Sequence, residues 1–173
     1  DIIEPGVYSL HYLNEESIVT EIIIDNNEKL ISYELKKGNF FYHPFPVFKE
    51  SKINQKWIEY IKETQARVGR LNSLFSFFTE FPTQLDNKIL RYYQKERRQY
   101  YKIFSKFIKD NSSNWAGLIV TNNPYYFSNL RKKPVVRDFL RQEYFWVDID
   151  TSNPKLINSP LYINHIKNYL NYV

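Results

Sequence analysis

The sequence predicts an α/β or α+β fold, in which an N-terminal antiparallel meander precedes two long helices and a C-terminal αβαβα unit completes a mixed sheet. Three patterns carry this prediction: alternating β-branched runs, long helical spacing, and a final alternation of short apolar runs with helical segments. The 173 residues suit one domain, divided into 1–48, 51–110 and 115–173. Because the chain has no methionine, even at position 1, we expect it to be a segment of a longer chain.

The first third has the pattern of antiparallel strands. Apolar and polar residues alternate in 6–13, residues 17–25 are rich in β-branched side chains, and 29–36 alternate again after the turn sequence DNNE. The run NFFYH at 39–43 predicts a fourth short strand. The sequence PFP at 44–46 ends the strands, because proline cannot donate a hydrogen bond to a sheet.

The middle of the chain has helical spacing. Ser51 is the predicted N-cap of a helix that runs from about residue 52 to 79, where Gly69 is a possible break. Thr83 is the predicted cap of a second helix, with Asp86 three residues later as in a capping box. This second helix is expected to end near residue 109, before the sequence DNSSN.

The last third alternates between predicted strands and helices. The short apolar runs at 115–121 and 144–150 predict buried strands. Asn123 as a cap and Pro124 at the first helical position predict a short helix through residue 132, and further helices are expected at 134–141 and 161–172. Together these elements predict two parallel strands joined by crossover helices.

The charge is distributed unevenly along the chain. Residues 1–35 have a net charge of −7, residues 88–109 of +7 and residues 131–141 of +4. At about 100° per residue, seven cations of the second helix fall within about 80° of arc, and they extend over about 30 Å. This cationic ridge consists of Lys88, Arg91, Lys95, Arg98, Lys102, Lys106 and Lys109.

Three interpretations of the ridge are open. It is a solvated helix face paired in part with the acidic N-terminal third, a phosphate-binding surface for nucleic acid, or a contact for an acidic protein or membrane surface. Tyr92 and Tyr101 flank the ridge, where aromatic rings stack on bases in single-strand-binding proteins. A second cluster is expected to extend the surface if it faces the same way: Arg131, Lys132, Lys133, Arg137 and Arg141.

The sequence contains few other candidates for a catalytic, metal-binding or ligand-binding site. The absence of cysteine excludes a disulfide, a thiolate metal site and a cysteine nucleophile. Asp148 and Asp150 would share one face of the predicted strand, where they could hold Mg²⁺ in a nuclease or cap the following turn. Asn122 and Asn123 follow the other predicted strand, as ligand contacts or as turn and cap residues. There is no glycine-rich phosphate loop.

A further indication is a resemblance. The segment LISYELKKGNFFYHP at 30–44 and the later order of helix, GLIVTNN, helix and FWVDID resemble the β-rich and degenerate exonuclease-like segments of B-family DNA polymerases of the epsilon type. The matching residues are Leu30, Leu35, Phe41 and Tyr42. The DID sequence departs from the Asp-x-Glu of that family, and no acid follows it, so the resemblance implies a catalytically inactive module associated with DNA replication.

The sequence therefore predicts a non-catalytic nucleic-acid-associated domain without a cofactor. The alternatives are a genuine or degenerate nuclease using Asp148, Asp150 and Mg²⁺, and a structural domain that binds other proteins. Other domains or subunits of a larger assembly are further expected partners. No run of about 20 apolar residues predicts a membrane span, and we expect an intracellular location, nuclear in a eukaryote.

Overall fold

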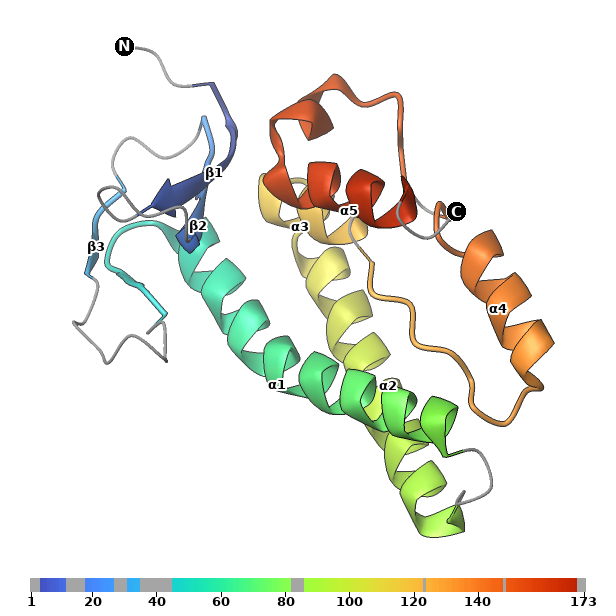
Figure 1. The fold of residues 1–173 in the computed structure, drawn as a ribbon. Coiled ribbons are helices and arrows are strands. Elements are labelled where there is room, and N and C mark those ends of the chain that lie inside the picture. Colours follow the sequence, from blue (N-terminus) through green and yellow to red (C-terminus); the bar gives the residue numbers. More distant parts are fainter. Residues whose placement is uncertain are drawn as a thin grey trace.

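The computed structural model describes residues 4–11, 18–26, 31–34, 45–81, 86–122, 124–147 and 149–170. The fold is mixed α/β and mostly helical. Two small antiparallel sheets lie near the N-terminal end of the first of two long helices (Figure 1). The predicted mixture of helices and strands is thus confirmed at this coarse level.

The first sheet pairs β1 (Gly6–His11) with β2 (Ile18–Ile24), from Gly6 opposite Ile24 to an irregularity between Leu10 and His11. The second pairs β3 (Tyr33–Glu34) with β4 (Val47–Phe48). Since β3 pairs with β4 and not with β2, the predicted single meander is wrong for the described residues. The predicted strand at 39–43 lies outside them.

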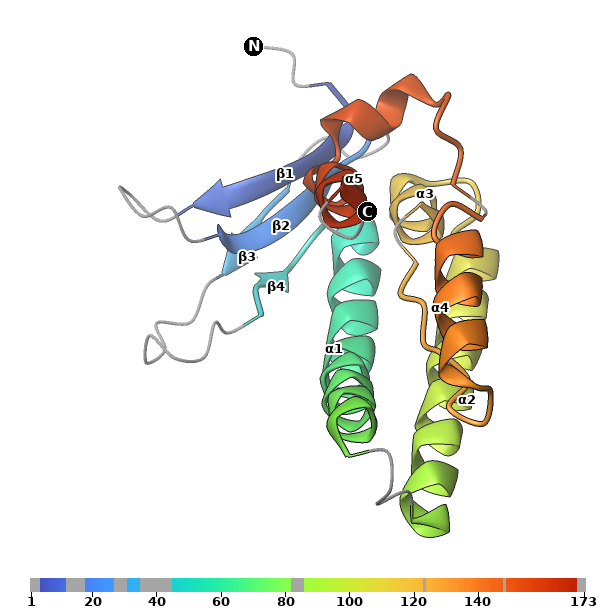
Figure 2. The same ribbon diagram turned by 45° about the vertical axis from the view of Figure 1, so that its right-hand side comes forward.

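Two long helices form the body of the molecule, and they run side by side in opposite directions (Figures 1 and 2). In α1 (Lys52–Glu80), the Ser51 side chain accepts a hydrogen bond from the Asn54 N–H, which confirms the predicted cap. The predicted break at Gly69 is wrong: α1 continues through this residue, where a Cβ would point into open space, and an exposed helical glycine costs only about 1 kcal/mol. Asp86 caps α2 (Asn87–Asp110), whereas the predicted cap, Thr83, lies outside the described residues.

The C-terminal third differs most from the prediction. The run at 115–121 is a buried helix, α3 (Trp115–Thr121), capped by the Asn114 side chain. Residues 124–129, called the extended segment below, have no regular secondary structure where a helix was expected, and 144–147 form turns and bends where a strand was expected. No strand follows β4 in the described part of the chain, so the predicted αβαβα unit and mixed sheet are wrong there.

Two of the remaining helices, α4 (Pro134–Glu143) and α5 (Pro160–Leu170), lie where the sequence predicts helices. The 3₁₀ helix η2 (Pro154–Asn158) was not predicted. The aromatic run before α5 anchors this helix and does not form a strand: the Phe145 ring stacks on His165 at 4.3 Å between centroids, and a His165 ring nitrogen lies 3.1 Å from the Phe145 carbonyl oxygen.

The interior consists of two clusters. One joins β1, β2, the first half of α1 and α3, with Val7, Ile23 and Trp57 at its centre. The other joins the second half of α1, α2 and the extended segment, with Leu71 and Tyr93 fully buried. Because α2 is covered by α1 on one side and by residues 124–132 on another, only one sector of it remains open to solvent.

Candidate nucleic-acid interface

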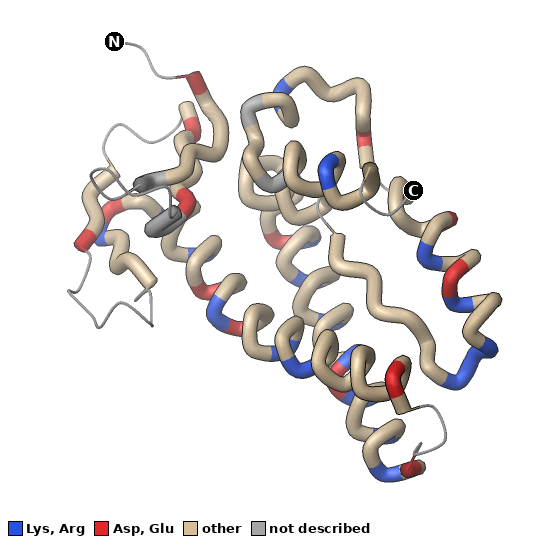
Figure 3. The backbone as a smooth tube through the Cα atoms, in the orientation of Figure 1, with Lys and Arg blue, Asp and Glu red and all other residues tan. Residues whose placement is uncertain are grey.

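The cationic ridge occupies the open sector of α2. All seven of its side chains are exposed, and Figure 3 shows Lys and Arg positions recurring along the length of this helix. The buried Tyr93 and Tyr100 face α1 on the opposite side. The amphipathic pattern of the sequence therefore places the ridge in solvent.

The one acidic residue within residues 88–109, Glu96, is turned away from the ridge. Its Oε2 accepts hydrogen bonds at 2.8 Å from Arg67 Nη1 and at 2.8 Å and 3.2 Å from Arg70, both on α1. Burial raises the pKa of Glu96, but the hydrogen bonds and charges of the two arginines outweigh burial and lower that pKa overall. Glu96 thus links α1 to α2 and neutralises no ridge cation.

No ion pair joins a ridge cation to any carboxylate in the described ranges. Glu34, from the acidic N-terminal third, pairs instead with Lys49. Compensation by the N-terminal third is thus not seen in the part of the chain that the structure describes.

Negative charges close to the ridge lie on α1 and at the end of α2. A groove of about 760 Å³ between the two helices is lined by Glu59 and Glu63 of α1 and by Lys102, Lys106 and Asp110 of α2. These pairs are beyond ion-pair distance. The C-terminal half of the ridge therefore lies beside charges of both signs, whereas Lys88, Arg91 and Lys95 do not line this groove.

The residues of the second cationic cluster have different surroundings. Arg131, Lys132 and Lys133 are exposed at the start of α4, and Lys132 lines a cleft beside α2. The Arg137 guanidinium lies 6.0 Å from the ring centroid of Phe75 on α1. Arg141 is exposed on the last turn of α4. Only Lys132 of this cluster lines the cleft that α2 borders.

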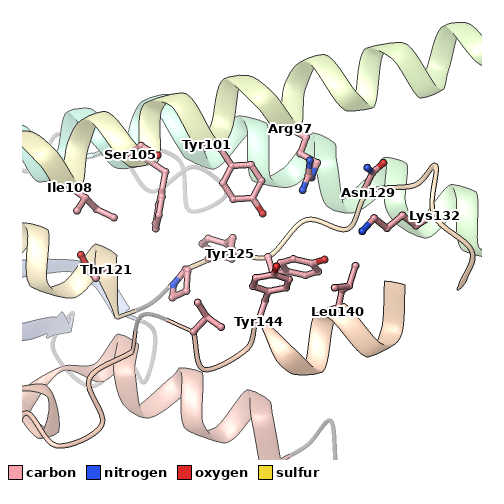
Figure 4. A pocket seen from close by; sticks show the side chains of 14 residues that line it. Arg97, Tyr101, Ser105, Ile108, Thr121, Tyr125, Asn129, Lys132, Leu140 and Tyr144 are labelled. Atoms are coloured by element: carbon pink, nitrogen blue, oxygen red, sulfur yellow. The ribbon is translucent and has the colours of Figure 1, made fainter. Parts of the chain in front are cut away.

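This cleft has a volume of about 810 Å³ and lies between α2, the extended segment and α4 (Figure 4). Arg97 stands at one end of it. Its Nε donates a 2.6 Å hydrogen bond to the Phe127 carbonyl, and its guanidinium carbon lies 5.1 Å from the Tyr101 ring centroid. Arg97 is not part of the predicted ridge, because at about 100° per residue it lies about 100° beyond Arg98, which is at the edge of the ridge.

Side chains of α2 hold the extended segment in place. Tyr93 Oη donates to the Ser128 carbonyl at 2.9 Å, Gln94 Nε2 to Asn129 Oδ1 at 2.9 Å, and the Phe127 N–H to Tyr101 Oη at 3.1 Å. Backbone groups of Phe127 and Ser128 are thus hydrogen-bonded to side chains of α2, without a helix. The local sequence had no pattern that predicts this, since the partners lie about 30 residues earlier.

Of the two proposed metal ligands, the structure describes only Asp150. Asp150 caps a turn: its Oδ1 accepts hydrogen bonds from the Ser152 N–H at 3.1 Å and the Ser152 hydroxyl at 2.6 Å. Asp148 lies outside the described residues. Asn122 Oδ1 accepts from the Asp150 N–H at 2.8 Å, while Asn123 is not described. Within the described ranges, no group of three or more His, Asp or Glu side chains is placed to hold a metal ion.

Among the described residues, no helix combines the length and apolar character that crossing a membrane requires. No protein-family model matches this chain, and neither a curated protein nor a solved structure matches it.

Proposed function

We propose that this chain is a non-catalytic nucleic-acid-binding domain that contacts the phosphate backbone through the cationic ridge of α2. The observation that carries the proposal is the seven-cation ridge, exposed over about 30 Å and without an ion pair to any described carboxylate. Like charges at spacings of three and four residues destabilise a helix by a few tenths of a kcal/mol per pair. An external polyanion would remove that cost.

Counterion release supplies the driving force. Each phosphate neutralised by a lysine or arginine releases condensed cations, so the logarithm of the binding constant falls linearly with the logarithm of the salt concentration. If all seven cations contact phosphates of a single strand, the slope is about −5, and raising the salt fourfold weakens binding about 1,000-fold. Partial engagement gives a proportionally smaller slope.

The test is charge reversal of four ridge residues, Arg91, Lys95, Arg98 and Lys102, to glutamate. These side chains are exposed, so the fold should persist. A matched control reverses four exposed cations outside the ridge: Lys52, Lys62, Lys155 and Lys167. Both variants carry the same total change in charge, so the comparison separates the position of the charges from their number.

Binding is measured by fluorescence anisotropy with a labelled oligonucleotide at several salt concentrations, and folding by circular dichroism. The ridge variant should lose binding, and the control should retain most of it. Equal losses in the two variants, a flat salt dependence, or no binding by the unmodified protein near physiological salt would each refute the proposal.

A second candidate, a protein-interaction domain, is favoured by the apolar side of α4. Val135 is 76% exposed and Phe139 is 60% exposed, and Val136 beside them is also exposed. Exposed apolar patches mark interaction sites. If this side binds a second copy of the chain, sedimentation velocity should detect a concentration-dependent dimer that Phe139→Ser abolishes; a monomer at all concentrations would count against self-association.

A further inference from the structure

The cleft beside α2 combines aromatic rings with positive charge. Of its fourteen lining residues, five are aromatic, two are cationic and none is acidic. Figure 4 shows Arg97, Asn129 and Lys132 together at one end and Ile108 and Thr121 at the other. A ligand that suits this arrangement has an anionic part and a flat, largely apolar part, as a nucleotide does.

Arg97 has donor groups that are available to an anion. Its Nε donates to the Phe127 carbonyl and its guanidinium carbon lies 5.1 Å from the Tyr101 ring centroid, so two contacts restrain the side chain. Its two terminal nitrogens have no hydrogen-bond partner within the described ranges. Neighbouring Asn129 uses its Oδ1 to accept from Gln94, which leaves its Nδ2 without a partner in the same part of the chain. The donors at this end of the cleft are therefore available to a phosphate or to a base edge.

The aromatic side of the cleft has accessible ring faces. Tyr125 is 51% exposed and Tyr144 is 47% exposed, although both line the cleft. The Tyr144 ring packs nearly parallel to Tyr126, with 5.6 Å between centroids and 10° between planes. Tyr125 packs in the same way on Phe127, at 6.2 Å and 15°. Each exposed ring is thus supported on one side, which lowers the entropic cost of stacking a ligand on the other.

The cleft and the ridge are neighbours on α2. At about 100° per residue, Ser105, which lines the cleft, lies about 20° from Arg98 of the ridge and about 40° from Lys109. A strand whose phosphates follow the ridge therefore passes the mouth of the cleft. Bases of a duplex are stacked and paired, whereas those of a single strand are free to turn aside.

We infer that the cleft receives a base of a single-stranded nucleic acid whose phosphates lie on the cationic ridge. This inference rests on the proposed function and deepens it, because it names single strands as the ligand. The base stacks on Tyr125 or Tyr144, and Arg97 and Lys132 contact the adjoining phosphate. Sequence preference is weak, since every base has a π-face.

The experiment compares three labelled probes by fluorescence anisotropy with the intact chain. They are a thymidine oligomer of about 15 nucleotides, an abasic oligomer with the same number of phosphates, and a duplex of the same length. We expect the thymidine oligomer to bind about tenfold or more tightly than the abasic one, as a stacked base contributes. Tyr144→Ala or Tyr125→Ala, whichever removes the ring that carries the base, should abolish that difference and leave abasic binding unchanged.

Phe139→Ala is the matched control, because this exposed aromatic residue lies on α4 but not in the cleft; it should leave all three affinities unchanged. Equal binding of thymidine and abasic oligomers, with neutral Tyr144→Ala and Tyr125→Ala variants, would refute the base site and leave the phosphate ridge standing. Tighter binding of the duplex would also refute it. Failure of every probe to bind would refute the proposed function itself.

Discussion

The ion cluster between α1 and α2 gives the sharpest stability prediction, for Glu96→Gln. The substitution keeps the shape of the side chain and removes its charge. In the native protein, one carboxylate oxygen accepts three hydrogen bonds from Arg67 and Arg70. The glutamate side chain is only 10% exposed, whereas the two arginines are 24% and 43% exposed.

These exposures set the size of the effect. A hydrogen bond to a charged group contributes about 1.5–3 kcal/mol, and removing one partner of a fully buried ion pair costs about 3–5 kcal/mol. Arg67 and Arg70 regain water when the carboxylate is lost, and the glutamine oxygen still accepts one bond. We therefore expect the free energy of unfolding to fall by about 2 kcal/mol, well below the sum of three bonds.

Urea unfolding followed by circular dichroism measures the change. Glu63→Gln is the control, because Glu63 is exposed on α1 and forms no ion pair with a described residue; its effect should stay within about 0.5 kcal/mol. The arginines lower the pKa of Glu96 in the folded state, so its contribution is complete above the unfolded pKa of about 4.3 and disappears as the pH falls through the folded value. A Glu96→Gln effect no larger than that of Glu63→Gln, or one that persists unchanged to pH 2, would refute this reasoning.

Three other predictions concern polar groups elsewhere. Asn54 is fully buried and exchanges two 2.7 Å hydrogen bonds with the backbone of Ile23, so Asn54→Leu should lower the free energy of unfolding by about 3 kcal/mol in urea, since two backbone groups lose their partners. Glu59→Gln with Glu63→Gln should tighten oligonucleotide binding about threefold at low salt by removing repulsion, and the gain should vanish at high salt; an unchanged affinity would contradict it. Burial raises the pKa of Glu21 to about 7, so the free energy of unfolding should fall as the pH rises from about 4.3 to 7, and Glu21→Gln should flatten this slope.

The long helices could be predicted because their signals are repeated many times. Over 24 residues of α2, apolar and cationic positions recur on opposite faces, and no single residue decides the outcome. The Ser51 cap could be predicted for a similar reason, since a polar residue directly precedes a periodic segment. The same redundancy placed the exposed face of the ridge correctly on the helix, although what binds it remains a proposal.

The short apolar runs lacked this redundancy. Seven residues at 115–121 fit either a buried strand or a buried helix, because both bury nearly every side chain. The signal that favours the helix was Asn114, whose side chain accepts from the Gly117 N–H at 3.1 Å. Gly117 has a tertiary role that no local pattern contains: a Cβ there would lie 2.0 Å from the Asn111 carbonyl oxygen, so only glycine lets the turn after α2 pack so closely.

The cleft was missed for the same physical reason. Its chemistry comes from α2, residues 124–132 and α4, and these segments come together only through side-chain contacts on the extended segment. Arg97 and Tyr101 of α2 bond to Phe127, a residue that the sequence placed in a helix. The periodicity of apolar residues shows which side chains share a face of one helix or strand. It does not show which distant backbone groups those side chains hydrogen-bond.

The ridge faces solvent because the packing of α2 fixes the rotation of this helix about its axis. Tyr93 and Tyr100 are buried against α1 and the extended segment, and the Tyr93 hydroxyl bonds to the Ser128 carbonyl. A rotation by one residue, about 100°, would break these contacts and turn much of the ridge toward a packed neighbour. Burying unpaired cations costs several kcal/mol each, so the tyrosines and the cations favour the same orientation. The surface available to a polyanion is therefore set by the buried face of the helix as much as by the charges themselves.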